Sequence, residues 1–276
     1  MAHTLQSTIT LSNEIKMPQF GLGVFETREG RQVRNAVRWA LEAGYRSIDT
    51  AAVYDNEAGV GRAIRDSGVP REDIFVTTKV WNSSQRSGHT PQALEASLRK
   101  LQMDYVDLYL VHWPVAGYYK QAWRDLETIY ESGRARAIGV SNFMVEHLRE
   151  LLPEAHITPM VNQIEFHPYL QSPELVALCQ EVGIQVEAWA PIMKGRVLKI
   201  EELRDLGNKY GKSAVQISLR WLLQRGIVAI PKSIKQQRII DNADIFDFEL
   251  TAEEIVMINS LDREQRVGPS PYNFNF

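Results

Sequence analysis

The sequence predicts an α/β protein, a (β/α)8 TIM barrel with an N-terminal β-hairpin and two extra helices. Eight short apolar runs alternate with amphipathic segments along nearly the whole chain, and several runs are apolar on both faces, as buried parallel strands are. Five of the seven helical patterns between them end at a glycine, which commonly stops a helix. The strand count favours closure into a barrel.

The predicted elements follow one another in a regular order. Strands are expected at 20–25, 45–49, 74–80, 106–112, 136–140, 160–166, 184–190 and 227–231. The helical patterns lie at 31–44, 56–68, 90–101, 119–133, 144–152, 172–183 and 212–226. Residues 7–17 read as two short strands around an Asn-Glu turn, so we expect a hairpin that closes the bottom of the barrel. The extra helices are expected at 235–246 and at 251–262, where Thr251 and Glu254 have the spacing of a capping box.

An open, doubly wound sheet is the structural alternative. When such a sheet binds a dinucleotide, it carries a G-x-G-x-x-G turn after its first strand. The two nearest matches begin at Gly21 and Gly59, and both lack the third glycine. No linker or low-complexity stretch interrupts the chain, so we expect a single barrel domain over residues 1–276.

The composition limits the class of protein. The chain has 276 residues, 44% hydrophobic and 24% charged, which suits a soluble protein with a sizeable core. Its net charge of -3 offers no basic surface for nucleic acid or a membrane. The single cysteine, Cys179, excludes an internal disulfide and fits a reducing compartment. The first residues do not indicate a signal peptide and no apolar run reaches about 18 residues, so a cytoplasmic location is expected.

Four ionisable residues lie at or just after the predicted ends of neighbouring strands. Asp49, Lys79 and His112 come at the ends of the second, third and fourth strands, and Tyr54 follows five residues after Asp49. Each residue alone has an ordinary structural explanation, such as a helix cap or a packed ring. The carboxyl ends of barrel strands meet at one mouth, however, and burying four such groups there costs several kcal/mol unless they pair. Together they indicate a catalytic site.

The pairing of these groups predicts an acid that polarises a carbonyl group. The positive charge of Lys79 favours the phenolate, so we expect it to lower the pKa of Tyr54 from the usual value of about 10. Asp49 would hold Lys79 in place and balance its charge. His112 would orient the substrate oxygen and help to relay a proton. The sequence offers no attacking group of its own, so an external hydride donor fits.

Several ordered motifs carry a resemblance to a known family. They are MPQFGLGVF, RSIDTAAVYDNE, VTTKVWN, DYVDLYLVHWP, AIGVSNF, VNQIEFHP and IPKSIKQQRIIDN, which span residues 17–242. With these motifs the chain resembles the aldo-keto reductases, in particular the compact bacterial and protozoal branch with glyoxal and methylglyoxal reductases, 2,5-diketogluconate reductases and prostaglandin F synthases. The resemblance implies a (β/α)8 barrel that binds NADPH without a Rossmann fold and reduces aldehydes or ketones to alcohols by hydride transfer.

The resemblance also implies which residues act on the substrate. The catalytic tetrad falls on Asp49, Tyr54, Lys79 and His112, with Tyr54 as the general acid. The residues expected to contact the substrate are Val24, Phe25, Tyr54, Trp81, His112 and Trp113. Because the loop at 193–202 and the tail that ends in YNFNF are short, we expect an open, permissive substrate pocket.

The residues implied for the cofactor fall into groups. Those for the nicotinamide are Ser141, Asn142 and Gln163, which bind its carboxamide, and Trp189, which stacks on its ring. Those for the adenosine 2′-phosphate and the adenine are Lys232, Ser233, Arg238, Asp241 and Asn242. The other implied contacts are Gly23, Val24, Phe25, Asp49, Ala190, Pro191, Ile192 and Ile234. Ala190 and Asp241 replace the family's usual Ser and Glu, and each replacement is expected to weaken cofactor binding modestly. Arg and Lys side chains suit a phosphate that carries about two negative charges.

Two other functions remain open beside an NADPH-dependent reductase. One is a non-catalytic barrel that keeps NADPH, because a fold alone does not guarantee catalysis. The other is an aldolase in which Lys79 forms a Schiff base, although the 2′-phosphate segment argues against it. No metal site is expected, because the sequence has no HExxH, CxxC or carboxylate cluster. The resemblance further implies a monomer.

Overall fold

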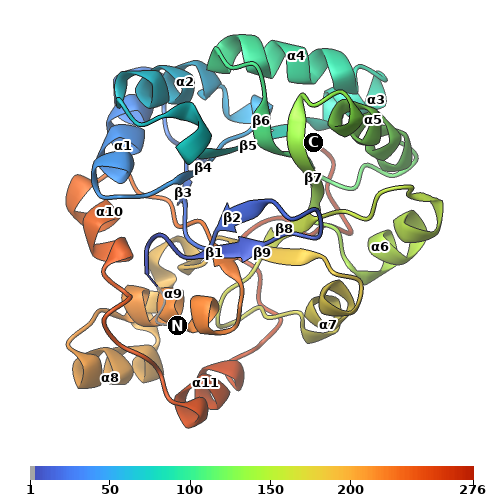
Figure 1. The fold of residues 1–276 in the computed structure, drawn as a ribbon. Coiled ribbons are helices and arrows are strands. Elements are labelled where there is room, and N and C mark those ends of the chain that lie inside the picture. The colour runs from blue at the N-terminus through green and yellow to red at the C-terminus, as the bar shows by residue number, and fades with distance from the viewer. Residues whose placement is uncertain (1–3) are drawn as a thin grey trace.

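Eight parallel strands curl into a barrel with helices outside it, in a computed structural model that describes residues 4–276 (Figure 1). The strands are β3 (Leu22–Gly23), β4 (Ser47–Asp49), β5 (Phe75–Val80), β6 (Val106–Val111), β7 (Ala135–Ser141), β8 (Val161–Glu165), β9 (Gln185–Trp189) and β10 (Val228–Ala229). They neighbour one another in sequence order. The barrel closes between its first and last strands, where the Gly21 amide donates to the Ala229 carbonyl at 3.0 Å and the Gly23 amide to the Pro231 carbonyl at 3.2 Å. The predicted (β/α)8 barrel is confirmed.

All eight predicted strands are present, and their ends agree with the predicted ends within two residues. Helices occur at the seven predicted positions: α1 (Arg31–Glu42), α2 (Glu57–Asp66), α4 (Thr90–Leu101), α5 (Tyr119–Glu131), α6 (Val145–Leu151), α7 (Pro173–Glu181) and α9 (Ala214–Gln224). The five glycines predicted to end helices all have positive φ, from 71° to 96°. A left-handed residue at this position is easiest for glycine, which explains why these helices end where they do.

Two helices were not predicted, α3 (Asn82–Arg86) and α8 (Glu201–Tyr210). Short 3-10 turns also occur as η1 (Ala52–Tyr54), η2 (Arg71–Asp73), η3 (Leu152–Glu154) and η4 (Met193–Lys199). Helix α8 is hard to see in the sequence because only Leu203 and Leu206 supply large buried apolar side chains, and Gly207 lies inside it. A Cβ atom at Gly207 would lie 2.5 Å from the Lys212 carbonyl oxygen, so close packing rather than helix propensity accounts for this glycine.

The predicted hairpin and the two extra helices are present. Strands β1 (Thr8–Thr10) and β2 (Lys16–Pro18) pair antiparallel, with Ile9 opposite Met17. Helices α10 (Gln236–Ala243) and α11 (Ala252–Asn259) follow the last strand. At the start of α11, the Glu254 amide donates to the Thr251 hydroxyl at 3.3 Å and the Thr251 amide to the Glu254 carboxylate at 2.8 Å, which completes the capping box.

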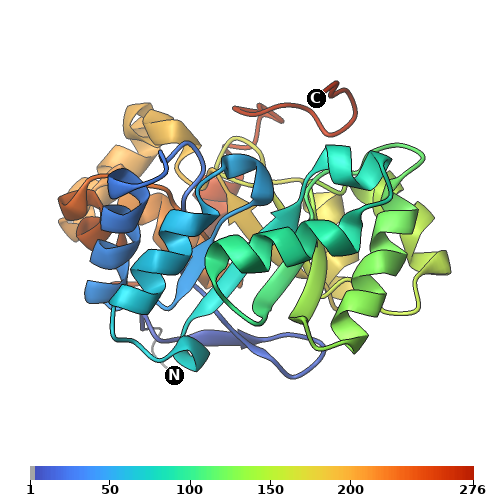
Figure 2. The same ribbon diagram turned by 90° about the horizontal axis from the view of Figure 1, so that it is seen from above.

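The hairpin and the C-terminal segment lie at opposite ends of the barrel (Figure 2). The hairpin covers the amino ends of the strands, and residues 260–276 cross the carboxyl ends. Within residues 4–276, no helix is both long and apolar enough to span a membrane. The prediction of one domain over residues 1–276 includes residues 1–3, which lie outside the described part, and it stays a prediction.

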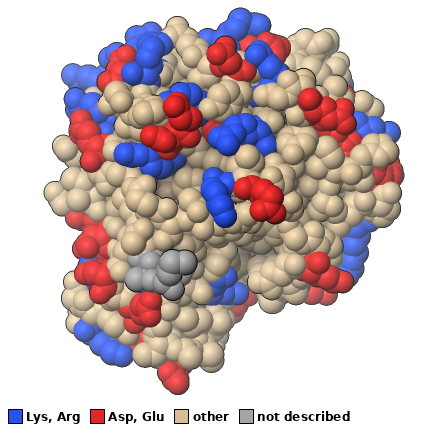
Figure 3. Space-filling model, viewed as in Figure 1, with Lys and Arg blue, Asp and Glu red and all other residues tan. Residues whose placement is uncertain are grey.

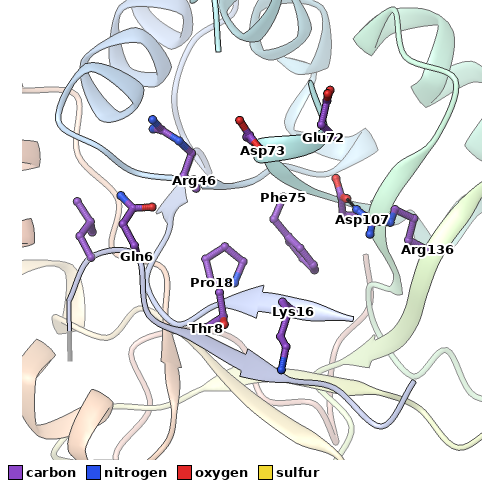
Figure 4. Close-up of a pocket in the computed structure, with 11 residues that line it drawn as sticks. Gln6, Thr8, Lys16, Pro18, Arg46, Glu72, Asp73, Phe75, Asp107 and Arg136 are labelled. Atoms are coloured by element: carbon purple, nitrogen blue, oxygen red, sulfur yellow. Dashed lines mark hydrogen bonds and ion pairs between the residues drawn. The ribbon is translucent and has the colours of Figure 1, made fainter. Parts of the chain in front are cut away.

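The hairpin end contains a cavity of about 330 Å³ between the hairpin and the strands above it (Figure 4). Its lining includes Lys16 from the hairpin and Arg46, Asp73, Asp107 and Arg136 from the barrel. On the outer surface of this face, acidic and basic side chains are interspersed rather than gathered by sign (Figure 3). The cavity lies at the opposite end of the barrel from the four ionisable residues that the sequence singles out.

Candidate active site

The four predicted tetrad residues lie together at the carboxyl end of the barrel. The Lys79 side chain is fully buried, and its Nζ donates to Asp49 Oδ1 at 2.7 Å and to the Thr50 carbonyl at 2.8 Å. The same Nζ lies 5.0 Å from the centre of the Tyr54 ring. The centre of the Tyr54 ring lies 5.7 Å from that of His112. Residues from three strands and one turn therefore form a single cluster.

Local structure explains how Tyr54 comes back toward the end of its own strand. After Asp49 the chain turns through η1, and Asp55 adopts a left-handed conformation with φ of 51°. The Asn56 side chain stabilises this turn with three hydrogen bonds. Its Nδ2 donates to the Val24 and Thr27 carbonyls at 3.0 and 2.9 Å, and its Oδ1 accepts from the Thr50 hydroxyl at 2.7 Å. The buried amide of Asn56 thus fixes the segment that carries Tyr54.

Burial and pairing set the charges of Lys79 and His112. Burial by itself lowers the pKa of Lys79, but the carboxylate of Asp49 and its hydrogen bond raise it, so that the net pKa lies above the usual value and the lysine stays charged. Burial, helped by the charge of Lys79, lowers the pKa of His112 well below its usual range. His112 is therefore a neutral imidazole at neutral pH, able to donate one hydrogen bond but not to act as a cationic acid.

The pKa of Tyr54 differs from the sequence prediction. Burial raises it, and this effect exceeds the lowering by the charge of Lys79, so the net pKa lies above the usual value. Asp49 and Glu187 add to the rise. The predicted influence of Lys79 has the expected sign, but the predicted net direction is wrong, because the cost of removing a phenolate from water exceeds the attraction of one neighbouring cation.

Glu187 is a buried carboxyl beside the tetrad that the sequence analysis did not single out. Its side chain is fully buried on β9, and Gln163 Nε2 donates to Glu187 Oε2 and to Asp49 Oδ2, each at 2.7 Å. Burial, followed by the charge of Asp49, raises the pKa of Glu187 to about 8. The alternation of strand side chains could have revealed this residue, since Glu187 lies two positions before Trp189 and on the same face of its strand.

The residues expected to hold a carboxamide lie side by side on β7, β8 and β9. The Asn142 amide nitrogen donates to the His112 carbonyl at 2.9 Å and to Ser141 Oγ at 3.1 Å. The Trp189 indole donates to Asn142 Oδ1 at 2.9 Å, which fixes the plane of the partly exposed Trp189 ring. The amide oxygen of Gln163 accepts no hydrogen bond within residues 4–276. These donors and acceptors suit an amide group, which both donates and accepts.

The segment after β10 carries the residues expected to bind a phosphate. Lys232 and Arg238 form no ion pair within the described residues 4–276, and Arg238 is exposed. Ser233 Oγ accepts from the Lys235 amide at 3.1 Å and so shapes the turn into α10. Two cations without carboxylate partners, next to a hydroxyl, are a donor set that fits a phosphate.

The remaining residues expected to contact the cofactor differ in exposure. Ala190 has φ of 51°, a left-handed conformation, and the next residue, Pro191, is buried, with its carbonyl accepting from the Ser218 hydroxyl at 2.9 Å. Asp241 is exposed and accepts from Gln237 at 2.8 Å. The others are the buried Gly23, Val24 and Asn242 and the partly buried Ile192 and Ile234.

Aromatic side chains surround Tyr54 and His112. The Phe25 ring is 51% exposed and lies 5.0 Å from the Tyr54 ring, centre to centre. The Trp81 ring lies 5.2 Å from His112. Val24, by contrast, is fully buried, so its side chain belongs to the core and not to the pocket surface.

The C-terminal segment covers this aromatic group. The Phe276 ring stacks on Trp81 at 5.6 Å, with 6° between the planes, and meets the edge of Trp113 at 5.1 Å. A main-chain oxygen of Phe276 accepts from Asn82 Nδ2 and from the Arg86 guanidinium, each at 3.0 Å. The tail therefore folds back onto Trp81 and Trp113, and the expectation of an open pocket stays a prediction.

A buried carboxylate fastens the start of this tail to β8. Glu165 accepts from the Val267 amide at 2.5 Å and from the Gly268 amide at 3.3 Å, and it pairs with Arg266 at 3.6 Å. A Cβ atom at Gly268 would lie 2.4 Å from the Trp189 ring, so only glycine lets the tail pass this close. Within residues 4–276, no cluster of three or more His, Cys, Asp or Glu residues suits a metal ion.

Comparison with known proteins identifies the family. Residues 19–263 match the Aldo/keto reductase family. The chain is 54% identical to the glyoxal reductase of Bacillus subtilis (strain 168) and 48% identical to the methylglyoxal reductase DkgA of Yersinia pestis, in both cases over 98% of each chain. Its fold is similar to that of a Bombyx mori aldo-keto reductase solved in complex with NADP, with 40% identity, a TM-score of 0.90 and coverage of 97% of this chain and 96% of that one. From the barrel, the Lys79 cluster and these matches, we conclude that the chain belongs to the Aldo/keto reductase family.

Proposed function

We propose that the protein is an NADPH-dependent reductase that converts aldehydes and ketones to alcohols, with Tyr54 as the general acid. The observation that carries the proposal is the cluster at the barrel mouth, where a buried Lys79–Asp49 ion pair of 2.7 Å lies against the Tyr54 ring. A buried cation beside a phenol is useful for proton donation and expensive for stability alone. Family membership and the NADP-bound relative support the same cofactor and reaction.

The residues present fit NADPH. Ser141, Asn142 and Gln163 offer hydroxyl and amide groups for a carboxamide, and Trp189 offers a ring whose plane Asn142 fixes. Lys232 and Arg238, together with the Ser233 hydroxyl, offer unpaired positive charge for a 2′-phosphate. The adenine would lie against Asp241 and Asn242. The fit of these donor sets to a 2′-phosphorylated dinucleotide favours NADPH over NADH.

The side chains supply a proton and hold the substrate. When bound, NADPH supplies a hydride to the carbonyl carbon. The Tyr54 O–H gives its proton to the carbonyl oxygen, so that the carbon gains a hydride and the oxygen a proton, and an alcohol results. Lys79 favours the loss of that proton, and Asp49 keeps Lys79 charged and in place. Neutral His112 donates a hydrogen bond that orients the same oxygen.

The substrates that suit the site best are small carbonyl compounds. Phe25, Trp81 and Trp113 form apolar walls around the tetrad, and Phe276 covers two of them. Two relatives are named for glyoxal and methylglyoxal, which are small dicarbonyl compounds. Both observations favour compact aldehydes and dicarbonyls over bulky ketones.

The two alternative functions have less support. A lysine that forms a Schiff base must be neutral and accessible, whereas Lys79 is fully buried, bound to Asp49 and has a raised pKa. A non-catalytic NADPH-binding barrel has no need of the costly buried cluster. Borohydride trapping of Lys79 with substrate would support the aldolase over the reductase.

The test is NADPH oxidation by the purified protein with a panel of small dicarbonyls, aromatic aldehydes, sugars and quinones, repeated with NADH. We expect turnover with the dicarbonyls and small aldehydes, and a lower KM for NADPH than for NADH. If no member of the panel oxidises NADPH, the reductase proposal fails. We further propose a cytoplasmic monomer that folds as one domain, which size-exclusion chromatography with light scattering and cell fractionation would check.

A further inference from the structure

Glu187 is a buried carboxyl group to which the proposed reduction mechanism gives no role. Its carboxyl is fully buried inside the barrel, and its Oε1 has no hydrogen-bond partner within residues 4–276. It forms no ion pair in this part of the chain. Buried carboxyls are normally paired with a cation or fully hydrogen-bonded, so this residue calls for an explanation.

The hydrogen bonds of Gln163 explain why Glu187 can be buried without a cation. Both hydrogens of the Gln163 amide are used, one by Asp49 Oδ2 and the other by Glu187 Oε2, each at 2.7 Å. Two carboxyl groups thus share one amide nitrogen, while within residues 4–276 only one cation, Lys79, lies in ion-pair contact, and it is bound to Asp49. Two carboxylates with a single cation would leave one unbalanced negative charge in the interior.

We propose that Glu187 is a positioning residue of the reduction site: it holds the Gln163 amide jointly with Asp49 and remains an uncharged carboxylic acid while the site works. This inference rests on the proposed reductase function. The groups that face Glu187 are Asp49 from β4, Lys79 from β5 and Tyr54 from η1. Burial and then Asp49 raise the pKa of Glu187 to about 8, in agreement with the proton that the geometry requires.

The carboxyl group of Glu187 affects both Gln163 and Tyr54. Because both hydrogens of Gln163 are held by carboxyl groups, its oxygen stays free to accept from an amide N–H, which is what a carboxamide offers. On the other side, ionised Glu187 raises the pKa of Tyr54 and makes it a weaker acid. Loss of the Glu187 proton should therefore slow reduction in alkaline solution.

The first test measures the pH dependence of kcat/KM for NADPH-dependent reduction in the wild type and in Glu187→Gln. We expect the wild type to lose activity above about pH 8. In Glu187→Gln, which cannot ionise, we expect this loss to begin at least about one pH unit higher. Glu187→Leu, which cannot accept from Gln163, should raise the Kd for NADPH roughly threefold to tenfold.

Glu57 provides a matched control. It too is buried, and one of its carboxylate oxygens has no hydrogen-bond partner within residues 4–276. Unlike Glu187, it has a cation, Lys100, at 3.8 Å from that oxygen, and its other oxygen accepts from Thr78, outside the tetrad. Glu57→Gln should leave the alkaline pH profile unchanged. A loss of activity in all these variants with an unchanged pH profile would mean a merely structural role and would overturn the inference.

The second test needs no cofactor and no turnover. Carbon NMR or difference infrared spectroscopy of the NADPH-free protein should detect one carboxyl group that titrates near pH 8 and that disappears in Glu187→Gln but not in Glu57→Gln. The absence of such a titration would refute the inference, whether or not the enzyme is active. A wild type that titrates in this way but reduces no carbonyl compound would instead refute the reductase function and, with it, the role of Glu187 in reduction.

Discussion

Both ends of the barrel bury charged groups, but the charges are fully paired at one end and incompletely paired at the other. At the amino ends of the strands, Asp107 is 1% exposed and its carboxylate is fully engaged. It accepts from the Val76 amide at 2.9 Å and pairs with Arg71 at 2.8 Å and with Arg136 at 2.9 Å. Each oxygen has a partner, and the arginines reach solvent. Such an arrangement stabilises the fold and does not indicate a catalytic role.

At the carboxyl ends, the charges are not balanced in this way. Lys79 is fully buried with one carboxylate partner, Glu187 has no cation, and an imidazole nitrogen of His112 has no partner within residues 4–276. The pKa values of Lys79, Glu187, His112 and Tyr54 are all displaced. The contrast teaches that function is indicated by charges that the fold leaves incompletely compensated, and not by buried charge itself.

The largest combined effect on stability and turnover should come from Lys79→Met at the carboxyl end. The change leaves Asp49 buried without its cation, so the free energy of unfolding should fall by about 3–5 kcal/mol. Turnover should fall at least about 100-fold, because Tyr54 loses the charge that assists proton donation. Chemical denaturation and steady-state kinetics measure the two effects. A variant that loses stability but keeps wild-type turnover would contradict the role given to Lys79.

Asp107→Ala at the amino end should separate stability from activity. We expect the free energy of unfolding to fall by about 2 kcal/mol, less than for a fully buried pair because both arginines are partly exposed. The kcat and the KM for NADPH should be unchanged. Urea denaturation and the same kinetic assay would check this, and a tenfold loss of kcat would break the proposed division between the two ends.

The free energy of unfolding should depend on pH through Glu187 at the carboxyl end. The pKa of Glu187 rises from about 4.5 to about 8 on folding, so the folded state holds a proton that the unfolded chain releases. Its contribution to stability is fully present below the unfolded pKa and is lost as the pH rises through the folded pKa. Between pH 5 and pH 9, the wild type should thus lose on the order of 4 kcal/mol that Glu187→Gln does not lose. Identical pH dependence of urea denaturation in the two proteins would show that Glu187 has no raised pKa.

The smallest effect should come from Phe276→Ala in the tail. Loss of the ring contacts with Trp81 and Trp113 should cost about 1 kcal/mol of tail association. The KM for bulky aromatic aldehydes should therefore fall roughly fivefold, while the KM for small dicarbonyls changes little. Kinetics with substrates of graded size would check this. An equal change for all sizes would argue against the tail as a cover for the pocket.

Most of the fold was predictable because it follows from short-range patterns. The strands show as apolar runs, and the glycines at 44, 68, 133, 183 and 226 end helices because they adopt positive φ. Helix α8 was not predicted, because its helical state depends on packing around Gly207 and not on an apolar stripe. The covering tail was not predicted either, since the contacts of Phe276 with Trp81 and Trp113 join residues far apart in the chain.

The tetrad residues of the candidate site could be predicted from the sequence, but the net pKa shift of Tyr54 and the presence of Glu187 could not. Strand ends brought Asp49, Lys79 and His112 to one mouth, as the barrel requires. The sign of the pKa shift of Tyr54 could not be predicted, because it depends on how far burial outweighs one cation. Glu187 was missed because its position inside the barrel matters only once Gln163 is seen to join it to Asp49.

We expect the incompletely compensated cluster at the carboxyl end to perform reduction with Tyr54 as the acid. The most direct test compares the wild type with Tyr54→Phe, which removes one hydroxyl and keeps the ring. Single-turnover NADPH oxidation should slow by about 10²–10⁴-fold, while the Kd for NADPH from fluorescence titration stays within about twofold. A Tyr54→Phe variant that reduces carbonyl compounds at close to the wild-type rate would show that Tyr54 is not the acid.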